Sequence, residues 1–274
     1  MKNINILVTC LLIFNFSKSF SQVKNSLSGI AHYTLTHHYD TLNYNIFQEE
    51  NFVLLLGKNS SLFKSRDKEI TDSLMENNRK RTGFMAPISN ARYTEEKILF
   101  NFNTKTLYTT SLKVIGDFKI KRDFPNIEWD IKSQKKKILG YNCQQATGNF
   151  HGRKFSVWFT NELPFTAGPW KLVGLPGLIV EAEDATNRIK FVLKSFQNKN
   201  NNDFNIEFTE NEISWLNYMK LAKAMQENPQ AYLEQKLGRK ISTTPPMLPL
   251  KRSPILPNYR FNYPLEAIEF YTKK

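Results

Sequence analysis

Cysteine is nearly absent from this sequence, with two in 274 residues. That number excludes a disulfide framework and a zinc site with four cysteine ligands. Eleven glycines exclude a collagen-like repeat, and a charged fraction of 23% argues against disorder. Apolar residues make up 41% of the chain, with 21 Phe and 11 Tyr among them, so the sequence can build a sizeable core.

Long apolar runs are missing after the first residues. The stretch 4–16 follows Lys2 and ends before Ser19-Phe20-Ser21, which has the spacing of a signal-peptidase site. The run is shorter than the roughly 20 residues that a bilayer span requires. Cys10 superficially resembles a lipid-attachment site, but the apolar run continues beyond it. We therefore expect residues 1–21 to be a signal peptide, no transmembrane span, and an exported protein in the periplasm or at the outer membrane.

Acidic residues are too few to balance the basic ones. The chain has 25 Asp and Glu against 38 Lys and Arg, a formal net charge of +13. The basic residues are dispersed, and the densest run is Lys135-Lys136-Lys137. In an exported protein this pattern indicates a solvated surface and no nucleic-acid partner; an anionic envelope partner such as a lipid headgroup or polysaccharide is the alternative.

Short segments with strand periodicity make up most of the chain. Their turn spacing is typical of an antiparallel meander. We expect residues 57–61 to be a turn and 67–81 a short helix or mobile loop. The segments expected to be strands are 29–35, 45–56, 98–102, 105–112, 114–121, 129–131, 141–160, 178–182 and 189–194.

The clearest hairpin spans residues 141–160, with 148–152 as its turn. A register centred near residue 150 would place Cys143 opposite Val157, on an apolar face. We expect a buried structural thiol there rather than a reactive one.

The end of the chain changes character, with a helical segment over 209–238. Thr209 and Glu212 have the spacing of a capping box, and an apolar stripe follows. Asn228-Pro229 predicts the start of a second helix, which Gly238 ends. The Pro-rich segment 242–258 predicts an extended tail. The predicted fold class is mainly β (α+β), a curved antiparallel sheet or open half-barrel with two C-terminal helices, in a single domain over 22–274.

No constellation of residues predicts catalysis. His37 and His38 point to opposite faces of a strand, so at most one could join His32 at a metal ion. Cys143 and His151 lie too far apart along the hairpin for a nucleophile and its base. We therefore expect no catalytic residues, no metal and no cofactor.

One motif is specific, the stretch from Gly168 to Glu181. Pro176-Gly177 fits the two central positions of a type II turn, with Gly177 at positive φ. The binding candidates from this region are Trp158, Trp170, Gly174, Leu175, Pro176, Gly177, Leu178 and Ile179; the alternative is that the motif is scaffolding.

Gly174 to Ile179 reads GLPGLI, and over about residues 129–195 the chain resembles the GLPGLI family of exported Bacteroidetes proteins. The resemblance implies export and possible partnership with an outer-membrane receptor of the TonB-dependent type; the family has no established biochemical function. The other matching residues are Gly140-Tyr141-Asn142-Cys143, Ala146, Arg153, Trp158-Phe159-Thr160, Leu163-Pro164, Gly168-Pro169 and Pro264-Leu265-Glu266.

The sequence thus favours a non-enzymatic cell-envelope protein that binds a hydrophobic ligand, an envelope lipid or an outer-membrane partner. The alternative is a hydrolase or other enzyme with an unrecognised site. A polar pocket with perturbed carboxylates would favour the enzyme, whereas a long apolar cleft would favour the binding protein.

Overall fold

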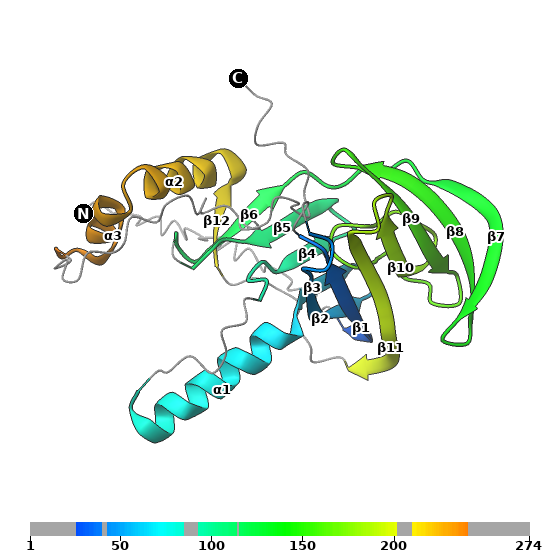
Figure 1. Cartoon of the computed structure of the whole chain (residues 1–274), viewed down its shortest axis with the longest axis horizontal. Coiled ribbons are helices and arrows are strands. Elements are labelled where there is room, and N and C mark those ends of the chain that lie inside the picture. The colour runs from blue at the N-terminus through cyan, green and yellow to red at the C-terminus, as the bar shows by residue number, and fades with distance from the viewer. Residues whose placement is uncertain (1–25, 40–42, 85–92, 114, 202–209, 241–274) are drawn as a thin grey trace, which may run out of the picture.

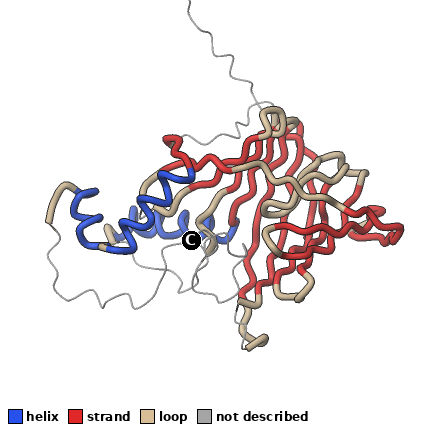
Figure 2. The backbone as a smooth tube through the Cα atoms, turned by 90° about the horizontal axis from the view of Figure 1, so that it is seen from above, coloured by secondary structure: helices blue, strands red, loops and turns tan. Residues whose placement is uncertain are grey.

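The computed structural model describes residues 26–39, 43–84, 93–113, 115–201 and 210–240. Its described strands form one 12-stranded sheet in the order β12-β6-β5-β4-β3-β2-β1-β11-β10-β9-β8-β7. All neighbours are antiparallel except β12 and β6, which are parallel. The sheet is curved and unclosed, with α2 and α3 beyond its β12 edge (Figures 1 and 2). The predicted fold class is confirmed.

The elements have the following bounds in chain order. They are β1 (Leu27–His37), β2 (Gln48–Gly57), β3 (Ser60–Ser65), α1 (Arg66–Thr82), β4 (Ile98–Asn101), β5 (Thr106–Thr110), β6 (Phe118–Arg122), β7 (Asp130–Ile138), β8 (Tyr141–Phe150), β9 (Arg153–Thr160), β10 (Leu178–Asp184), β11 (Ile189–Asn201), β12 (Asn211–Ser214), α2 (Trp215–Glu227) and α3 (Pro229–Leu237).

The main core combines one face of the sheet with the long loop between β9 and β10. Strand β1 illustrates the pattern, because Ala31, Tyr33 and Leu35 are buried while their neighbours are half-buried. The loop adds its own buried side chains to the same cluster, Trp170 among them. The hydroxyl of Tyr33 donates to the backbone oxygen of Ile179 at 2.7 Å, so the strand and the start of β10 are joined directly.

Two helices pack at the sheet's edge and one projects. Helix α2 buries Tyr218, Ala222 and Met225, part of the predicted apolar stripe. Helix α1 buries no residue; it projects from the sheet (Figure 1) and is joined to it at its capped start, Ser65. Among the described residues, no helix is long and apolar enough to cross a bilayer.

The sequence predicted the bounds of helix α3 correctly but not the start of helix α2. Helix α3 begins at Asn228 and ends at Gly238 as expected. The capping box is wrong, because Ser214 caps α2 and Glu212 belongs to β12, which pairs with β6. Thr209 and the tail 242–258 lie outside the described residues.

The hairpin of β8 and β9 has a different register from the expected one. Its turn is His151-Gly152, both at positive φ (47° and 74°), and Phe150 pairs with Arg153. Cys143 therefore does not face Val157, which pairs with Ala146. The thiol is nevertheless buried, as predicted, opposite Lys136 of β7. The turn expected over 57–61 is shorter in the structure, because Gly57 belongs to β2 and Ser60 and Ser61 belong to β3, where Ser61 pairs with both β2 and β4.

Candidate functional site

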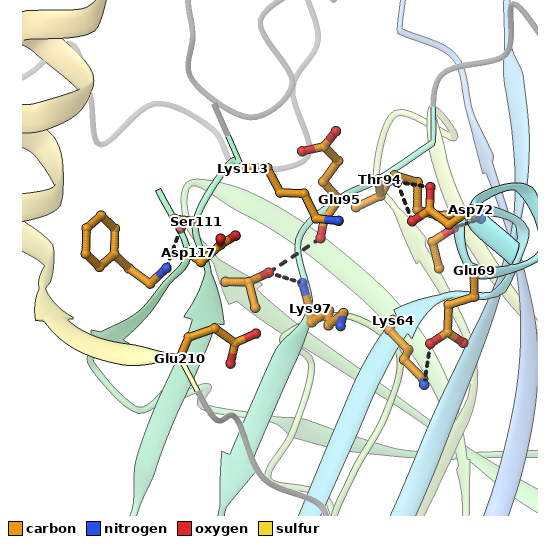
Figure 3. Close-up of a pocket in the computed structure, with 14 residues that line it drawn as sticks. Lys64, Glu69, Asp72, Thr94, Glu95, Lys97, Ser111, Lys113, Asp117 and Glu210 are labelled. Atoms are coloured by element: carbon orange, nitrogen blue, oxygen red, sulfur yellow. Dashed lines mark hydrogen bonds and ion pairs between the residues drawn. The ribbon is translucent and has the colours of Figure 1, made fainter. Parts of the chain in front are cut away.

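A polar pocket of about 310 Å³ opens where α1, the start of β4 and the loop between β5 and β6 meet (Figure 3). Because the antiparallel meander returns its strand ends to one rim of the sheet, segments far apart in sequence converge here. The lining residues are Lys64, Ser65, Lys68, Glu69, Asp72, Thr94, Glu95, Lys97, Thr110, Ser111, Lys113, Asp117, Phe118 and Glu210.

The helical wall of the pocket is held by local ion pairs. Lys64 contacts Glu69 at 2.5 Å, and Lys68 contacts Asp72 at 2.5 Å, one helical turn further on. The backbone N–H of Lys68 also donates to the Ser65 hydroxyl at 3.0 Å, which caps α1. These charges are therefore neutralised within the wall and orient its side chains.

The opposite wall carries charges without such partners. Among the described residues, Glu95, Asp117, Lys97 and Lys113 form no ion pair with one another or with any neighbour. One carboxylate oxygen of Glu210 is buried and has no hydrogen-bond partner in the described part of the chain. Leaving a buried acceptor unpaired costs free energy. A ligand that donates a hydrogen bond to this oxygen would remove that cost.

Two hydroxyls shape the floor between these walls. Thr110 accepts from the backbone N–H of Lys97 at 2.9 Å and donates to the backbone oxygen of Glu95 at 3.4 Å. Ser111 donates to the backbone oxygen of Gly116 and accepts from the N–H of Phe118 at 2.9 Å. The segment before β4 is thus bonded to strand β5, and the loop between β5 and β6 is closed by its own serine.

A buried carboxyl group, Glu50 of β2, lies behind the pocket wall and is 2% exposed. Its two oxygens accept from the backbone N–H and the hydroxyl of Thr94 at 2.7 and 2.8 Å, and Ser65 adds a further hydrogen bond. Burial raises the pKa of Glu50, the nearby Asp67 raises it further, and these hydrogen bonds oppose the rise. Glu50 therefore joins two lining segments without lining the pocket itself.

This arrangement suits a ligand rich in hydroxyl groups. Carboxylates accept, ammonium groups donate and the serine and threonine hydroxyls do both, so a polyhydroxylated molecule finds a partner for each group. Carboxylates and lysines are also the groups that accept and supply protons in hydrolysis. Among the described residues, no three His, Cys, Asp or Glu side chains are placed to hold a metal ion.

None of the binding candidates from the sequence lines this pocket. Trp170, Leu175, Leu178 and Ile179 are buried in the main core. The exposed ones are Gly174 and Pro176, while Gly177 is buried. Trp158 is half-buried on the other face of the sheet, with the ammonium of Lys136 4.4 Å from its ring centre.

The predicted type II turn is also wrong. Gly174 has φ 101°, whereas Gly177 lies outside the left-handed region. The N–H of Gly177 donates to the oxygen of Leu175 at 2.9 Å, which makes a three-residue turn around Pro176.

The histidines serve separate local environments. His32 has a buried ring nitrogen without a hydrogen-bond partner among the described residues, and burial with nearby Arg66 lowers its pKa. His37 is buried, His38 stacks on Tyr44 at 3.8 Å, and His151 forms the hairpin turn beside Phe150.

Sequence reasoning missed every residue of the pocket. Its charged residues come from four separate stretches of the chain, so no single spacing brings them together. One signal was present, the polar run Thr94-Glu95-Glu96-Lys97 immediately before a buried strand. Strand ends of this kind carry functional residues more often than strand centres do.

Comparisons with known proteins identify one family model and two solved structures that are similar to this chain. The family model described as "N-glycanase peptide, N-terminal domain" matches residues 89–220. Two crystal structures of PNGF-II, in space groups P21 and C2, are similar to this chain at 16% identity, with TM-scores of 0.51 and 0.50. Each alignment covers 71% of this chain, and the chain spans about a third (33% and 32%) of those structures. No curated protein matches.

These matches correct the functional expectation. The sequence favoured a non-enzymatic protein of unknown function that binds a hydrophobic ligand or an envelope partner, but the matched family model describes the N-terminal domain of an N-glycanase. The prediction of no enzyme is therefore wrong, and the alternative of a hydrolase fits better. The region 89–220, which includes the GLPGLI stretch, resembles the N-terminal domain of an N-glycanase.

Proposed function

We propose that this chain acts in the hydrolytic removal of N-linked glycans, with the polar pocket as its saccharide site. The observation that carries the proposal is the N-glycanase match over 89–220. Nine of the 14 lining residues fall inside that match, from Thr94 to Phe118 together with Glu210. The matched region and the pocket therefore coincide along most of one wall.

The chemistry of the pocket supports a sugar ligand. Its volume of about 310 Å³ lies at the lower end of small-ligand sites. Its lining offers charged acceptors, charged donors and hydroxyls, with Phe118 as an apolar surface. An N-linked glycan presents hydroxyl and amide groups that need both kinds of partner.

Hydrolysis of the glycan–asparagine linkage requires two proton transfers. A base takes a proton from the attacking water, and an acid gives one to the departing nitrogen. Glu95, Asp117 and Glu210 supply carboxylates for this exchange, and Lys97 and Lys113 supply ammonium groups that stabilise developing negative charge. Water is consumed, and no other reactant is needed.

The test uses a glycopeptide that carries one neutral N-linked oligosaccharide. Release is followed by the mass of the peptide, and binding by calorimetry with the same glycopeptide. We expect release to fall in Glu95→Gln, Asp117→Asn and Glu210→Gln, because each removes a charge from the pocket. Glu128→Gln is the matched control, since that exposed carboxylate does not line it.

Two outcomes would contradict the proposal. A wild-type chain that neither releases nor binds the oligosaccharide would overturn it entirely. Binding without release would restrict the role to glycan recognition. Because the chain spans about a third of the PNGF-II structures, both measurements are needed.

Three expectations from the sequence stay predictions. We propose export with cleavage after Ser21, membership of the GLPGLI family, and association with an outer-membrane receptor or envelope lipid. The first is checked by the intact mass of exported protein, where a retained N-terminus would contradict it. Co-purification from the native envelope checks the partner.

A further inference from the structure

The short segment 94–97 is held in place on both sides of Glu95. Thr94, before it, bonds to the buried Glu50, and Glu96, after it, bonds to the buried Lys171. Glu95 lies between these two contacts and lines the pocket (Figure 3). Two charged groups from distant parts of the chain thus converge on the neighbours of one pocket carboxylate.

The first tether is the carboxyl group of Glu50. It binds both the backbone N–H and the side chain of Thr94, at 2.7 and 2.8 Å, so it fixes the backbone as well as one rotamer. The same carboxyl bonds to Ser65, the cap of α1. Glu50 therefore lies between the start of the helical wall and segment 94–97.

The second tether comes from the specific motif of the sequence. Lys171 is 1% exposed, and its ammonium group lies 3.4 Å from the Glu96 carboxylate. The same ammonium lies 5.7 Å from the ring centre of Trp170. A lysine in the middle of the core loop thus reaches the rim of the pocket.

Neither contact is expected to stabilise the fold much by itself. Burying a charge is costly, and a buried ion pair often stabilises a fold no better than apolar residues of the same size. Such a pair instead fixes the position of the residues next to it, because it holds them in one geometry. Thr110 adds a third contact by bonding to the backbone at Glu95 and Lys97.

We infer that Glu95 is the pocket carboxylate that contacts the glycan, and that Lys171 and Glu50 are positioning residues that hold it there. This inference rests on the proposed glycan site and deepens it. It assigns Lys171, the buried lysine of the stretch from Gly168 to Glu181, to the site through Glu96.

The experiment compares Lys171→Met with Arg153→Met. Arg153 also forms a buried ion pair, with Asp184 at 3.5 Å and side chains 8% and 2% exposed, and neither residue lines the pocket. Both variants lose a buried cation, so both lose stability. Only Lys171→Met should slow glycan release or weaken glycopeptide binding, by about tenfold to a hundredfold, as expected for a misplaced reacting group.

Two further variants separate positioning from general loss of structure. Lys171→Arg keeps the charge and should retain most of the activity. Glu96→Gln removes the same ion pair from its more exposed side, where the side chain is 16% exposed, and serves if Lys171→Met does not fold. Combining Glu96→Gln with Lys171→Met should cost less than the sum of the single variants, because the contact between the two residues is lost in both.

Amide hydrogen exchange provides a readout that needs no glycan. Exchange at Thr94 to Lys97 should accelerate in Lys171→Met and in Glu50→Gln but not in Arg153→Met. Unchanged exchange there would overturn the tethers. Faster exchange with glycan binding unchanged would overturn the role of Glu95. If the wild type does not bind the glycopeptide, the proposed function fails, while the exchange data still decide on the tethers.

Discussion

At Gly177, a close backbone approach explains the residue better than any turn type. A β-carbon there would lie 2.1 Å from the backbone oxygen of Thr160, the residue that pairs with Leu178. Only glycine lets the chain enter β10 at that distance. The Pro-Gly pair in the sequence indicated a bend, but it could not show which strand end would lie against it.

We predict that Gly177→Ala destabilises the protein by about 1–3 kcal/mol or more, because the backbone of β9 must move. The free energy of unfolding is measured with urea. Gly174→Ala is the comparison: Gly174 has φ 101°, and the nearest atom to a β-carbon there would be 3.6 Å away, so only backbone strain is added. A greater loss in Gly174→Ala would contradict the close-approach explanation.

The buried carboxyl of Glu50 makes a prediction about pH. Its pKa is raised in the folded state, mainly by burial, so the folded protein holds the proton more tightly than the unfolded chain does. Stability from this group is then fully present below the unfolded pKa of about 4.3 and is lost as pH rises through the folded value.

We therefore expect Glu50→Gln to flatten the change of unfolding free energy with pH from about pH 4 upward. Urea unfolding at several pH values checks it. Glu49→Gln, at the exposed carboxylate that precedes Glu50 in the same strand, is the control. An unchanged pH profile in Glu50→Gln would show that the carboxyl is not the source.

At the scale of elements, local signals predicted what local interactions determine. Asn228, Pro229 and Gly238 bound helix α3, and each acts on the backbone within a few residues. The predicted cap of α2 failed because Glu212 is drawn into β12 by pairing with β6, a strand about 90 residues away. Sequence spacing carries no information about that pairing.

We predict that Ser214→Ala costs about 1 kcal/mol, whereas Ser214→Asp retains stability because it can still accept from the helix. The relevant bond is from the N–H of Asn217 to the Ser214 hydroxyl, at 3.3 Å. Amide exchange at Asn217 and the urea midpoint measure the effect. Equal stability of the alanine and aspartate variants would show that the helix begins elsewhere.

The pocket is a stronger example of contacts that local sequence patterns cannot predict. Its residues lie at strand ends and in connecting loops, and they meet only because the meander returns to one rim of the sheet. Alternation of apolar residues predicted most strands, since that pattern reflects one buried face. It could not predict which loops would face each other, nor the register of the hairpin at His151.

At the scale of the whole molecule, the loop between β9 and β10 covers the apolar face of the sheet, as a second layer would. A curved sheet buries its inner face only if something fills the curve. Here the loop supplies Leu163, Trp170 and Leu172 to the main core, which also includes side chains of β1, β2 and β4. Through Lys171, the same loop also contacts Glu96 beside the pocket.

Trp170 and Trp158 provide the test of this architecture. Trp170 is 4% exposed and packs on Phe150 and Phe155, with ring centres 5.4 and 6.3 Å away. Trp158 lies on the other face, half-buried under Lys136.

We predict that Trp170→Ala costs about 3–5 kcal/mol, as for a large core side chain, and that Trp158→Ala costs clearly less. Because the loop fills the core shared by distant strands, Trp170→Ala should lower the urea midpoint equally for probes at β1 and at β9. Loss of structure at β9 alone would mean that the loop stabilises only its own hairpin, and not the sheet as a whole.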